Sequence, residues 1–517
     1  MNIKSYKFTS TVTGASIFLF FAALVSRGIG FIREMIFAGA FGLSNNFDNY
    51  LIASVIPVTI NTILYFIAQN YFIPAFTRIS ILNKDKSNQF LSRSFLLFVI
   101  LGLVISIVLY FSSALLIEKF FRLDDANKSQ ALDVFILFLF TIPISSGLSI
   151  IIAYLQKEKN FVSPAISSFV LNLVVIIVVL LFTSKLGIIA IASGYLLGTM
   201  FQFLYLAYKS DFKKYIFKIK NIEIDKSTEM FSSSLLMIIL IESIGQLYSL
   251  SDRYFVSQVI EGGVTAINYA QSLITLPISI ISVSISSAMF PKISENFHSN
   301  SISELETSFK KAISVSLLFF IPITFVFNIY GKELITLLFQ RGQFDISDTF
   351  TTNEALQYFN FGLIFYAIYS IFNKVLYSAK LIKTLFIITI LGVIIKVIFN
   401  SVLVGILNYK GLALSTTISY FFFFAASMIA IKITFKFEWI LKSLLTFIFF
   451  FAIAIVSWLI AEIIFSNLTS LNIASDLKMA AFLILYFTTL LSIRFELVVD
   501  ILDPLKEKII MIFRKFY

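Results

Sequence analysis

The chain has 517 residues, of which 58% are hydrophobic and 13% are charged, and its formal net charge is +11. Because soluble domains carry about 25% charged residues, this composition excludes a soluble globular protein and is typical of a multi-pass membrane protein. The absence of cysteine excludes disulfides, thiolate metal sites and cysteine nucleophiles, and the basic residues lie in short loops between apolar runs, which argues against nucleic-acid binding.

Fourteen apolar runs are long enough to cross a bilayer as helices, for which about 20 residues suffice. The loops that alternate onto one side of the membrane hold most of the lysines and arginines, and this bias predicts that both termini are cytoplasmic. We therefore expect an all-α membrane protein with 14 transmembrane helices. The runs cover residues 14–40, 48–74, 94–116, 131–154, 161–183, 186–208, 228–252, 262–290, 311–330, 352–377, 384–407, 411–435, 440–465 and 478–498.

The first run contains three charged residues, Arg27, Arg33 and Glu34. An arginine at the centre of a membrane helix costs roughly 2.5–3.5 kcal/mol, so charged residues there are functional by default. Paired guanidinium groups grip a phosphate or a carboxylate bidentately, and we expect Arg27 and Arg33 to bind an anion. The alternative is that Arg27 and Glu34 form a structural ion pair while Arg33 extends to the membrane interface.

Asp48 begins the second run, which carries no further charge before Arg78. An aspartate in a first turn complements the helix dipole, so helix capping alone accounts for this residue. The functional interpretation is that Asp48 is a gate partner for Arg27 or Arg33 when the outer side closes.

A pattern in the second run recurs in the eighth. Asn49-Tyr50 followed by Pro57 corresponds to Asn268-Tyr269 followed by Pro277, and Phe72-Ile73-Pro74 corresponds to Phe290-Pro291. Because parallel repeats are a transporter architecture, runs one to twelve predict two six-helix lobes, with the last two runs appended. The expected boundaries are 1–208 for the first lobe, 209–227 for a cytoplasmic linker, 228–436 for the second lobe, 437–500 for the appended pair and 501–517 for a cytoplasmic tail.

A second polar constellation comprises Glu242 in the seventh run, Lys396 and Asn400 in the eleventh, and Thr416 in the twelfth. Lys396 and Asn400 are four residues apart and face the same way on a helix. We expect Lys396 and Glu242 to form a fixed or protonation-controlled ion pair; the alternative is that each charge extends separately to an interface. The adjacent Asp252 and Arg253 are interpreted as an interfacial pair without a binding role.

Several motifs resemble those of one family. They are Ser26-Arg27 with Gly30-Phe31 and Arg33-Glu34, then Phe41-Gly42, Asp48 and Pro57, Leu338-Phe339 with Gly342 and Phe344, Tyr377-Ser378 before Lys383-Thr384, and Asn400 followed by Gly411-Leu412. Together they resemble the MurJ (MviN) family of lipid II flippases, within the multidrug/oligosaccharidyl-lipid/polysaccharide exporter superfamily. The resemblance implies two lobes around a cationic cavity that takes the pyrophosphate and sugars of an undecaprenyl-linked substrate, with a lipid-tail groove at helices 13 and 14. Arg27, Arg33 and Asp48 match cavity residues of the family, and Glu34 adjoins them.

The sequence departs from the family pattern at two places. Asn61 stands near the position of an expected arginine in the second helix, and Gln271-Ser272 replaces an aspartate–arginine pair in the eighth. We expect Asn61 and Ser272 to belong to the substrate site, which then carries less positive charge. In sodium-binding relatives, acid and amide oxygens of the seventh, eleventh and twelfth helices hold the cation. Asn400 and Thr416 fall at such positions, and the Lys396 ammonium group would take the place of the cation.

The resemblance implies a flippase of the bacterial cytoplasmic membrane whose partners are the bilayer, an undecaprenyl-pyrophosphate-linked oligosaccharide and, in some settings, cell-wall synthesis proteins. We expect no cofactor and no enzyme activity, because the chain lacks a phosphate-binding loop, a nucleophile elbow and metal-ligand spacing. The missing arginines leave open a different lipid-linked glycan, such as an O-antigen, capsule or teichoic-type unit. A multidrug or cation antiporter and a non-transporting cell-wall scaffold are the remaining alternatives.

Overall fold

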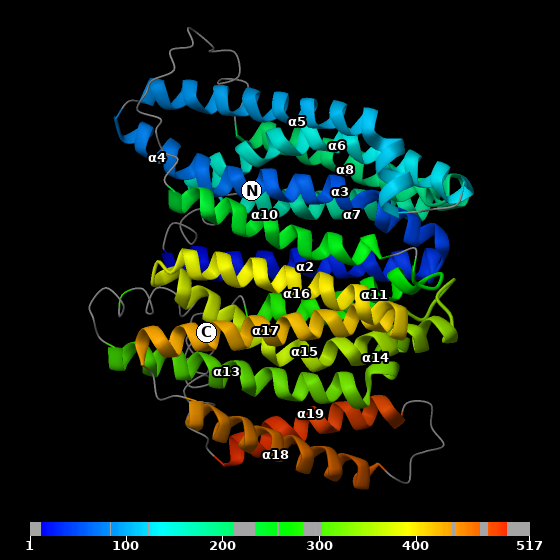
Figure 1. Cartoon of the computed structure of the whole chain (residues 1–517), viewed down its shortest axis with the longest axis vertical. Helices are drawn as coiled ribbons and strands as arrows, with labels where there is room; N and C mark the ends of the chain where they lie inside the picture. Colours follow the sequence, from blue (N-terminus) through cyan, green and yellow to red (C-terminus); the bar gives the residue numbers. More distant parts are fainter. Residues whose placement is uncertain are drawn as a thin grey trace, which may run out of the picture. The chain divides into compact units, whose positions relative to one another are not determined.

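The computed structural model describes residues 12–82, 84–121, 125–210, 233–255, 258–282, 285, 295, 302–436, 440–465 and 474–493. Every regular element among these residues is a helix (Figure 1). The helices are α2 (Val12–Phe41), α3 (Asn45–Ile67), the π-helical turn η1 (Ala68–Phe72), α4 (Ile73–Leu82), α5 (Lys84–Phe121), α6 (Asp125–Lys157), α7 (Val162–Leu186), α8 (Ile189–Lys209), α10 (Ser233–Tyr254), α11 (Gly263–Pro277), the π-helical turn η4 (Ile278–Ser282), α13 (Ile302–Ile329), α14 (Gly331–Phe339), α15 (Ile346–Ser378), α16 (Ile382–Leu407), α17 (Tyr409–Phe435), α18 (Ile440–Ile464) and α19 (Ala474–Ser492).

The helical membrane fold predicted from the apolar runs is confirmed. Within the described residues, twelve helices are long and apolar enough to cross a bilayer, and α2 and α10 coincide with the other two predicted runs. The count of 14 spans and the cytoplasmic placement of both termini stay predictions. Most of the predicted linker at 209–227 and the whole predicted tail at 501–517 lie outside the described residues.

Two of the repeated helices each contain a π-helical turn. The second predicted run contains the π-helical turn η1 just before Pro74, and the eighth contains η4 directly after Pro277. Each of the two helices therefore contains one π-helical turn, which lies near a different proline of the repeated pattern.

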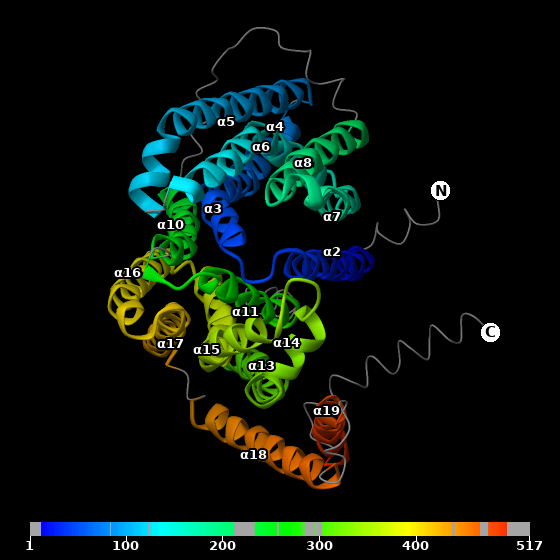
Figure 2. The ribbon, with the colours of Figure 1, turned by 90° about the vertical axis from the view of Figure 1, so that its right-hand side faces the viewer.

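The chain divides into two compact units, which are described separately. Unit 1 comprises residues 1–272, 339–351 and 389–415, and unit 2 comprises residues 273–338, 352–388 and 416–517. In unit 1, α6 packs against α3, α5 and α8, while α7 packs against α8 and α2 (Figure 2). Buried side chains such as Phe72, Leu91 and Ile151 fill the interior of this bundle.

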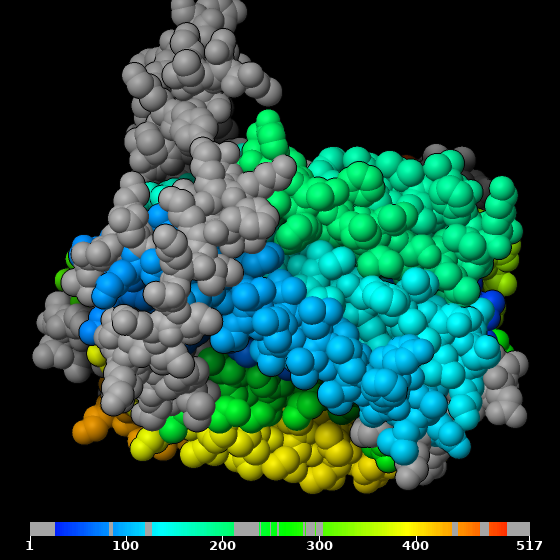
Figure 3. Space-filling view, turned by 90° about the horizontal axis from the view of Figure 1, so that it is seen from above, coloured from blue at the N-terminus to red at the C-terminus, as the bar shows by residue number. Residues whose placement is uncertain are grey.

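The outer surface of unit 1 is apolar along α5. Leu97, Val108 and Phe111 are exposed on this helix, which lies across the face seen in Figure 3. In a membrane protein, an exposed apolar helix face is the face that contacts lipid.

In unit 2, the last two helices pack on each other and on α13. Lys478 of α19 forms an ion pair with Glu462 of α18, with 2.6 Å between Nζ and Oε2. The Tyr486 hydroxyl of α19 donates to the Leu318 carbonyl oxygen of α13 at 3.2 Å. A charged contact and a buried hydroxyl therefore tie the two C-terminal helices to each other and to α13.

Candidate functional site

Arg33 lies at the centre of a polar cluster in unit 1. Its Nη1 donates to Asn172 Oδ1 on α7 at 2.9 Å, and its Nη2 donates to Glu34 Oε1 at 2.6 Å. The guanidinium carbon lies 5.3 Å from the ring centre of Tyr195 on α8 and 5.6 Å from that of Phe37, distances at which a cation is attracted to the ring face. The cluster therefore draws side chains from three helices around one guanidinium group.

The cluster keeps capacity for a further ligand. The side chains of Arg33 and Glu34 are 19% and 17% exposed, so water or a ligand can reach them. Among the described residues, Arg33 Nε has no hydrogen-bond acceptor. A buried donor without a partner is costly, and a bound anion would supply that acceptor.

The structure pairs Glu34 with Arg33, so the alternative Arg27–Glu34 ion pair is wrong. Arg27 lies on the same helix and is partly exposed.

A second arginine is linked to this cluster. Asn268 of α11 donates from Nδ2 to Glu34 Oε2 at 3.5 Å, and Arg253 of α10 donates from Nη2 to Asn268 Oδ1 at 3.2 Å. Within the described residues, Arg253 Nη1 has no acceptor. Arg253 is therefore linked through Asn268 to Glu34, while the absence of a binding role stays a prediction. Two sequence features point to Arg253. It follows Asp252 in an otherwise apolar run, and its partner Asn268 belongs to the repeated pattern.

Asp48 caps a helix other than its own. Its Oδ2 accepts from the Gly262 N–H at 2.8 Å, and its Oδ1 accepts from the N–H and hydroxyl of Thr265 at 2.8 and 2.5 Å. These donors belong to the N-terminus of α11, where free N–H groups and the helix dipole favour a carboxylate. The first turn of α3 is capped instead by Ser44, whose side chain accepts from the Phe47 N–H. In this conformation Asp48 thus joins α3 to α11, and neither Arg27 nor Arg33 is its hydrogen-bond donor.

Two glycines shape the contact between the α2–α3 turn and the segment that joins α14 to α15. Gly42 and Gly342 have φ angles of +56° and +59°, a region that suits glycine. The Gln343 N–H donates to the Gly39 carbonyl oxygen at 2.9 Å, and a Cβ at Gly342 would collide with that oxygen. The Leu43 N–H donates to Asp348 Oδ2 at 3.0 Å. The motif around Gly342 therefore supports the C-terminal end of α2, the helix that carries Arg33 and Glu34.

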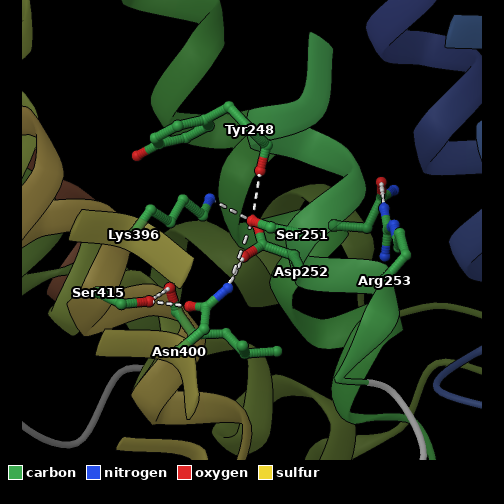
Figure 4. Close-up of polar contacts among 9 residues, drawn as sticks. Tyr248, Ser251, Asp252, Arg253, Lys396, Asn400 and Ser415 are labelled. Carbon is green, nitrogen blue, oxygen red and sulfur yellow. Dashed lines mark hydrogen bonds and ion pairs between the residues drawn. The ribbon is translucent and has the colours of Figure 1, made fainter. Parts of the chain in front are cut away.

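The second polar constellation forms a buried ion pair (Figure 4). Lys396 of α16 is fully buried, and its Nζ lies 2.8 Å from Asp252 Oδ2 on α10. The same Nζ lies 3.6 Å from the ring centre of Tyr248. Asn400 donates from Nδ2 to Asp252 Oδ1 at 3.0 Å, and its Oδ1 accepts from the Ser415 hydroxyl of α17.

The carboxylate that pairs with Lys396 is Asp252, so the prediction of Glu242 as its partner is wrong. Glu242 lies ten residues earlier on α10, which is about 15 Å along the helix axis and on another face. Asp252 is 6% exposed and lies inside the protein. Thr416, the residue expected to share this site, is buried in α17, but the hydroxyl that reaches Asn400 belongs to its neighbour Ser415.

The oxygen atoms of this site do not fit a bound sodium ion as they stand. The ammonium group of Lys396 contacts the Asp252 carboxylate directly, and the Asn400 amide presents its nitrogen to that carboxylate rather than its oxygen. A sodium site needs oxygen ligands facing the ion. In this structure the positive charge that contacts the Asp252 carboxylate is therefore the ammonium group of Lys396.

The two positions that depart from the family pattern lie apart from the arginine contacts. Asn61 of α3 donates from Nδ2 to Thr141 Oγ1 of α6 at 3.1 Å and lines a cavity of about 550 Å³ inside unit 1. The Ser272 hydroxyl donates to the Tyr269 carbonyl oxygen within α11 at 2.7 Å. Ser272 is partly exposed.

The family model described as "Lipid II flippase MurJ" matches residues 37–493. The chain belongs to this family. It is 28% identical over 415 residues to a probable lipid II flippase MurJ of Buchnera aphidicola subsp. Schizaphis graminum, covering 77% of this chain and 78% of that protein. It is 27% identical over 427 residues to the lipid II flippase MurJ of Thermosipho africanus, covering 78% of this chain and 82% of that protein. The resemblance drawn from the motifs is confirmed.

Solved structures of MurJ and of its superfamily share the fold. A lipid II flippase MurJ in an inward closed conformation matches with a TM-score of 0.77 at 22% identity, covering 92% of this chain and 99% of that one. An inward-facing multidrug transporter of the MATE family, in the same MOP superfamily, matches with a TM-score of 0.65 at 15% identity, covering 79% of this chain and 94% of that one. Family membership and the apolar helices make this chain a multi-pass protein of the inner membrane.

Proposed function

We propose that this chain moves an undecaprenyl-pyrophosphate-linked saccharide, foremost the peptidoglycan precursor lipid II, from the inner to the outer leaflet of the cytoplasmic membrane. Two observations support the proposal. The relatives that cover most of its length are named lipid II flippases, and α2 carries Arg33, whose side chain is 19% exposed and whose buried Nε has no acceptor among the described residues. Such a group binds a phosphate strongly where little water competes. The Arg33 cluster is the observation that carries this proposal.

In the proposed cycle, Arg27 and Arg33 hold the pyrophosphate, and Arg253 adds positive charge beside them. Glu34 and Asn268 keep the guanidinium groups in place while the site is empty, and the anion takes over the Glu34 contact when it binds. Asp48 acts as the gate residue by holding or releasing the N-terminus of α11. Two six-helix lobes, formed from residues 1–208 and 228–436, alternate in access to the two leaflets. Helices α18 and α19 accept the lipid tail.

The finer topology of the proposal is 14 transmembrane helices with both termini in the cytoplasm. Twelve apolar helices, together with α2 and α10, match the predicted runs in order. An even number of spans places both termini on one side, and the lysine and arginine bias assigns that side to the cytoplasm.

Wild-type protein is the first test of this function. It is expressed in a bacterium depleted of its own lipid II flippase, and lipid II in the outer leaflet is measured together with growth. We expect the wild type to restore both. Correctly inserted protein that restores neither would contradict lipid II as the substrate and favour another lipid-linked glycan, which the neutral residues Asn61 and Ser272 also suggest.

We further propose that transport does not depend on sodium, because Lys396 supplies a fixed positive charge to Asp252. The expected result is the same flipping rate in proteoliposomes when sodium is replaced by potassium or choline at constant ionic strength. A Lys396→Ala variant provides the comparison, since it frees the carboxylate for a cation. Stimulation of the wild-type protein by sodium would contradict the proposal.

A further inference from the structure

Residues 339–348, which run from the end of α14 to the first turn of α15, hold the turn between α2 and α3. This 339–348 segment belongs to unit 1, as do both helices that flank the turn. The Asp348 carboxylate accepts from the Leu43 N–H at 3.0 Å, and the Gln343 N–H donates to the Gly39 carbonyl oxygen at 2.9 Å. Two hydrogen bonds therefore join the turn to a segment that is about 300 residues distant in the sequence.

The same turn is held on a second side by the start of α11. Asp48, which follows the turn, accepts from the backbone N–H groups of Gly262 and Thr265. The Leu43 carbonyl oxygen lies so close to Gly262 that a Cβ at this glycine would collide with it. Asp48 and Asp348 thus each bind a backbone N–H of another element, and the 339–348 segment, the α2–α3 turn and the start of α11 form one junction.

Aromatic side chains fill the interior of this junction. Phe339 and Phe344 of the 339–348 segment are buried, and their ring centres lie 5.2 and 5.8 Å from that of Tyr269 on α11. Phe47 of α3 stacks on the same tyrosine at 5.6 Å. The Tyr269 hydroxyl is buried and has no hydrogen-bond partner among the described residues. An unsatisfied buried hydroxyl is unfavourable, so the packed junction carries a cost that falls when the rings separate and water reaches this group.

The polar contacts of the 339–348 segment are of a kind that breaks and re-forms. Arg341 and Gln343 are exposed, so water can reach the segment and replace its hydrogen bonds to the turn at a small net cost. This end of α2 and α3 is the outer one in the proposed topology, because the lysine and arginine bias assigns the other end to the cytoplasm. A transporter that alternates its access must open and close at this end.

We propose that the 339–348 segment is a latch that closes the outer side, with Asp348 as a second gate residue in addition to Asp48. This inference rests on the proposed function and topology, because only a chain that alternates its access needs a gate. The latch holds while Asp348 accepts the Leu43 N–H and Phe344 packs on Tyr269. Its release frees the α2–α3 turn and the outer end of α2. Asp348 is thus a positioning residue, which acts through the turn and not on the substrate.

The test measures access from outside, and the absence of cysteine makes a single introduced thiol a clean reporter. Ser145→Cys places that thiol in the cavity of unit 1, and a membrane-impermeant maleimide is added to intact cells. We expect Asp348→Ala to raise the labelling rate on the order of tenfold, the size expected for loss of a hydrogen bond to a charged group. Asp348→Asn keeps an oxygen acceptor and should raise the rate less. Glu333→Ala removes a carboxylate from the first turn of α14, outside the latch, and should leave the rate unchanged.

Two further variants act on the same contact by other means. Gly342→Ala leaves Asp348 in place, but its Cβ would collide with the Gly39 carbonyl oxygen, so it should also raise the labelling rate. Leu43→Cys combined with Asp348→Cys places two thiols at the contact, and a short bifunctional thiosulfonate reagent can join them. Joining should stop flipping, and reduction should restore the rate measured before the reagent was added. Each single-cysteine variant treated with the same reagent should keep its rate.

The outcomes separate the latch from the proposed function. Labelling that stays at the reporter's rate in both Asp348→Ala and Gly342→Ala, or flipping that continues after the two thiols are joined, would overturn the latch and leave the flippase proposal standing. A wild-type protein that flips no lipid would overturn the flippase proposal, while the labelling, which needs no lipid, still decides whether this segment closes the outer side. If Asp348→Ala does not insert in the membrane, Gly342→Ala decides the labelling test.

Discussion

Replacing Arg33 by alanine is expected to abolish lipid flipping while protein remains in the membrane. The guanidinium group lies between Asn172 and Glu34 with one donor unused, and each charge-assisted hydrogen bond to a phosphate contributes about 1.5–3 kcal/mol. Loss of two such bonds weakens binding on the order of a hundredfold or more. The measurement is lipid II in the outer leaflet of a bacterium depleted of its own flippase, at matched amounts of protein.

Two further variants make this result specific. Arg33→Lys keeps the charge but loses the planar fork, so we expect partial activity. Arg78→Ala removes an arginine of α4 outside the cluster and should leave flipping unchanged. Full rescue by Arg33→Ala would exclude the α2 cluster as the anion site. Equal loss in Arg78→Ala would attribute the effect to general charge rather than to this position.

Removing the lysine of the buried ion pair is expected to have the largest effect on stability. In Lys396→Met, the Asp252 carboxylate loses the ammonium group 2.8 Å away in a site where both side chains are almost fully buried. Breaking a buried pair by removing one partner typically costs 3–5 kcal/mol, because the other charge is left uncompensated. We expect a clear drop in the melting temperature of the purified protein and in the amount inserted in membranes.

A double-mutant cycle tests the cause of this loss. Lys396→Met combined with Asp252→Asn removes both charges and should recover much of the lost stability, since the two residues are directly coupled. Lys310→Met is the matched control. Lys310 pairs with Glu306 one turn away on α13, with side chains 29% and 20% exposed, and a partly exposed pair loses less on removal of one partner than a fully buried one. Additive effects in the cycle would contradict the coupling of Lys396 with Asp252.

The capping role of Asp48 is compatible with its proposed role as a gate residue. Its carboxylate receives three hydrogen bonds from the start of α11, so α3 and α11 move together while these bonds hold. Asn268 on the same helix contacts Glu34. A movement of α11 therefore reaches both Asp48 and the arginine cluster, which gives the proposed gate a physical link to the proposed anion site.

The sequence by itself determined the class of this protein and the centre of its candidate site. Length and hydropathy of the apolar runs are local properties, because a helix in lipid must satisfy its own backbone hydrogen bonds. Arg33 and Glu34 stood out for a similarly local reason, namely the cost of charge within an apolar run. The family motifs around Arg33 and Gly342 could also be recognised from neighbouring residues in the sequence alone.

Only the tertiary structure decided which distant side chains meet. Lys396 pairs with Asp252 rather than Glu242, Arg253 joins Asn268 and Glu34, and Asp48 caps α11 instead of α3. Each contact depends on the rotation and axial position of one helix against another. One residue turns a helix by about 100° and advances it by about 1.5 Å, so small differences in packing exchange one partner for another. The spacing of residues along a single helix determines neither the rotation nor the axial position of that helix against its neighbours.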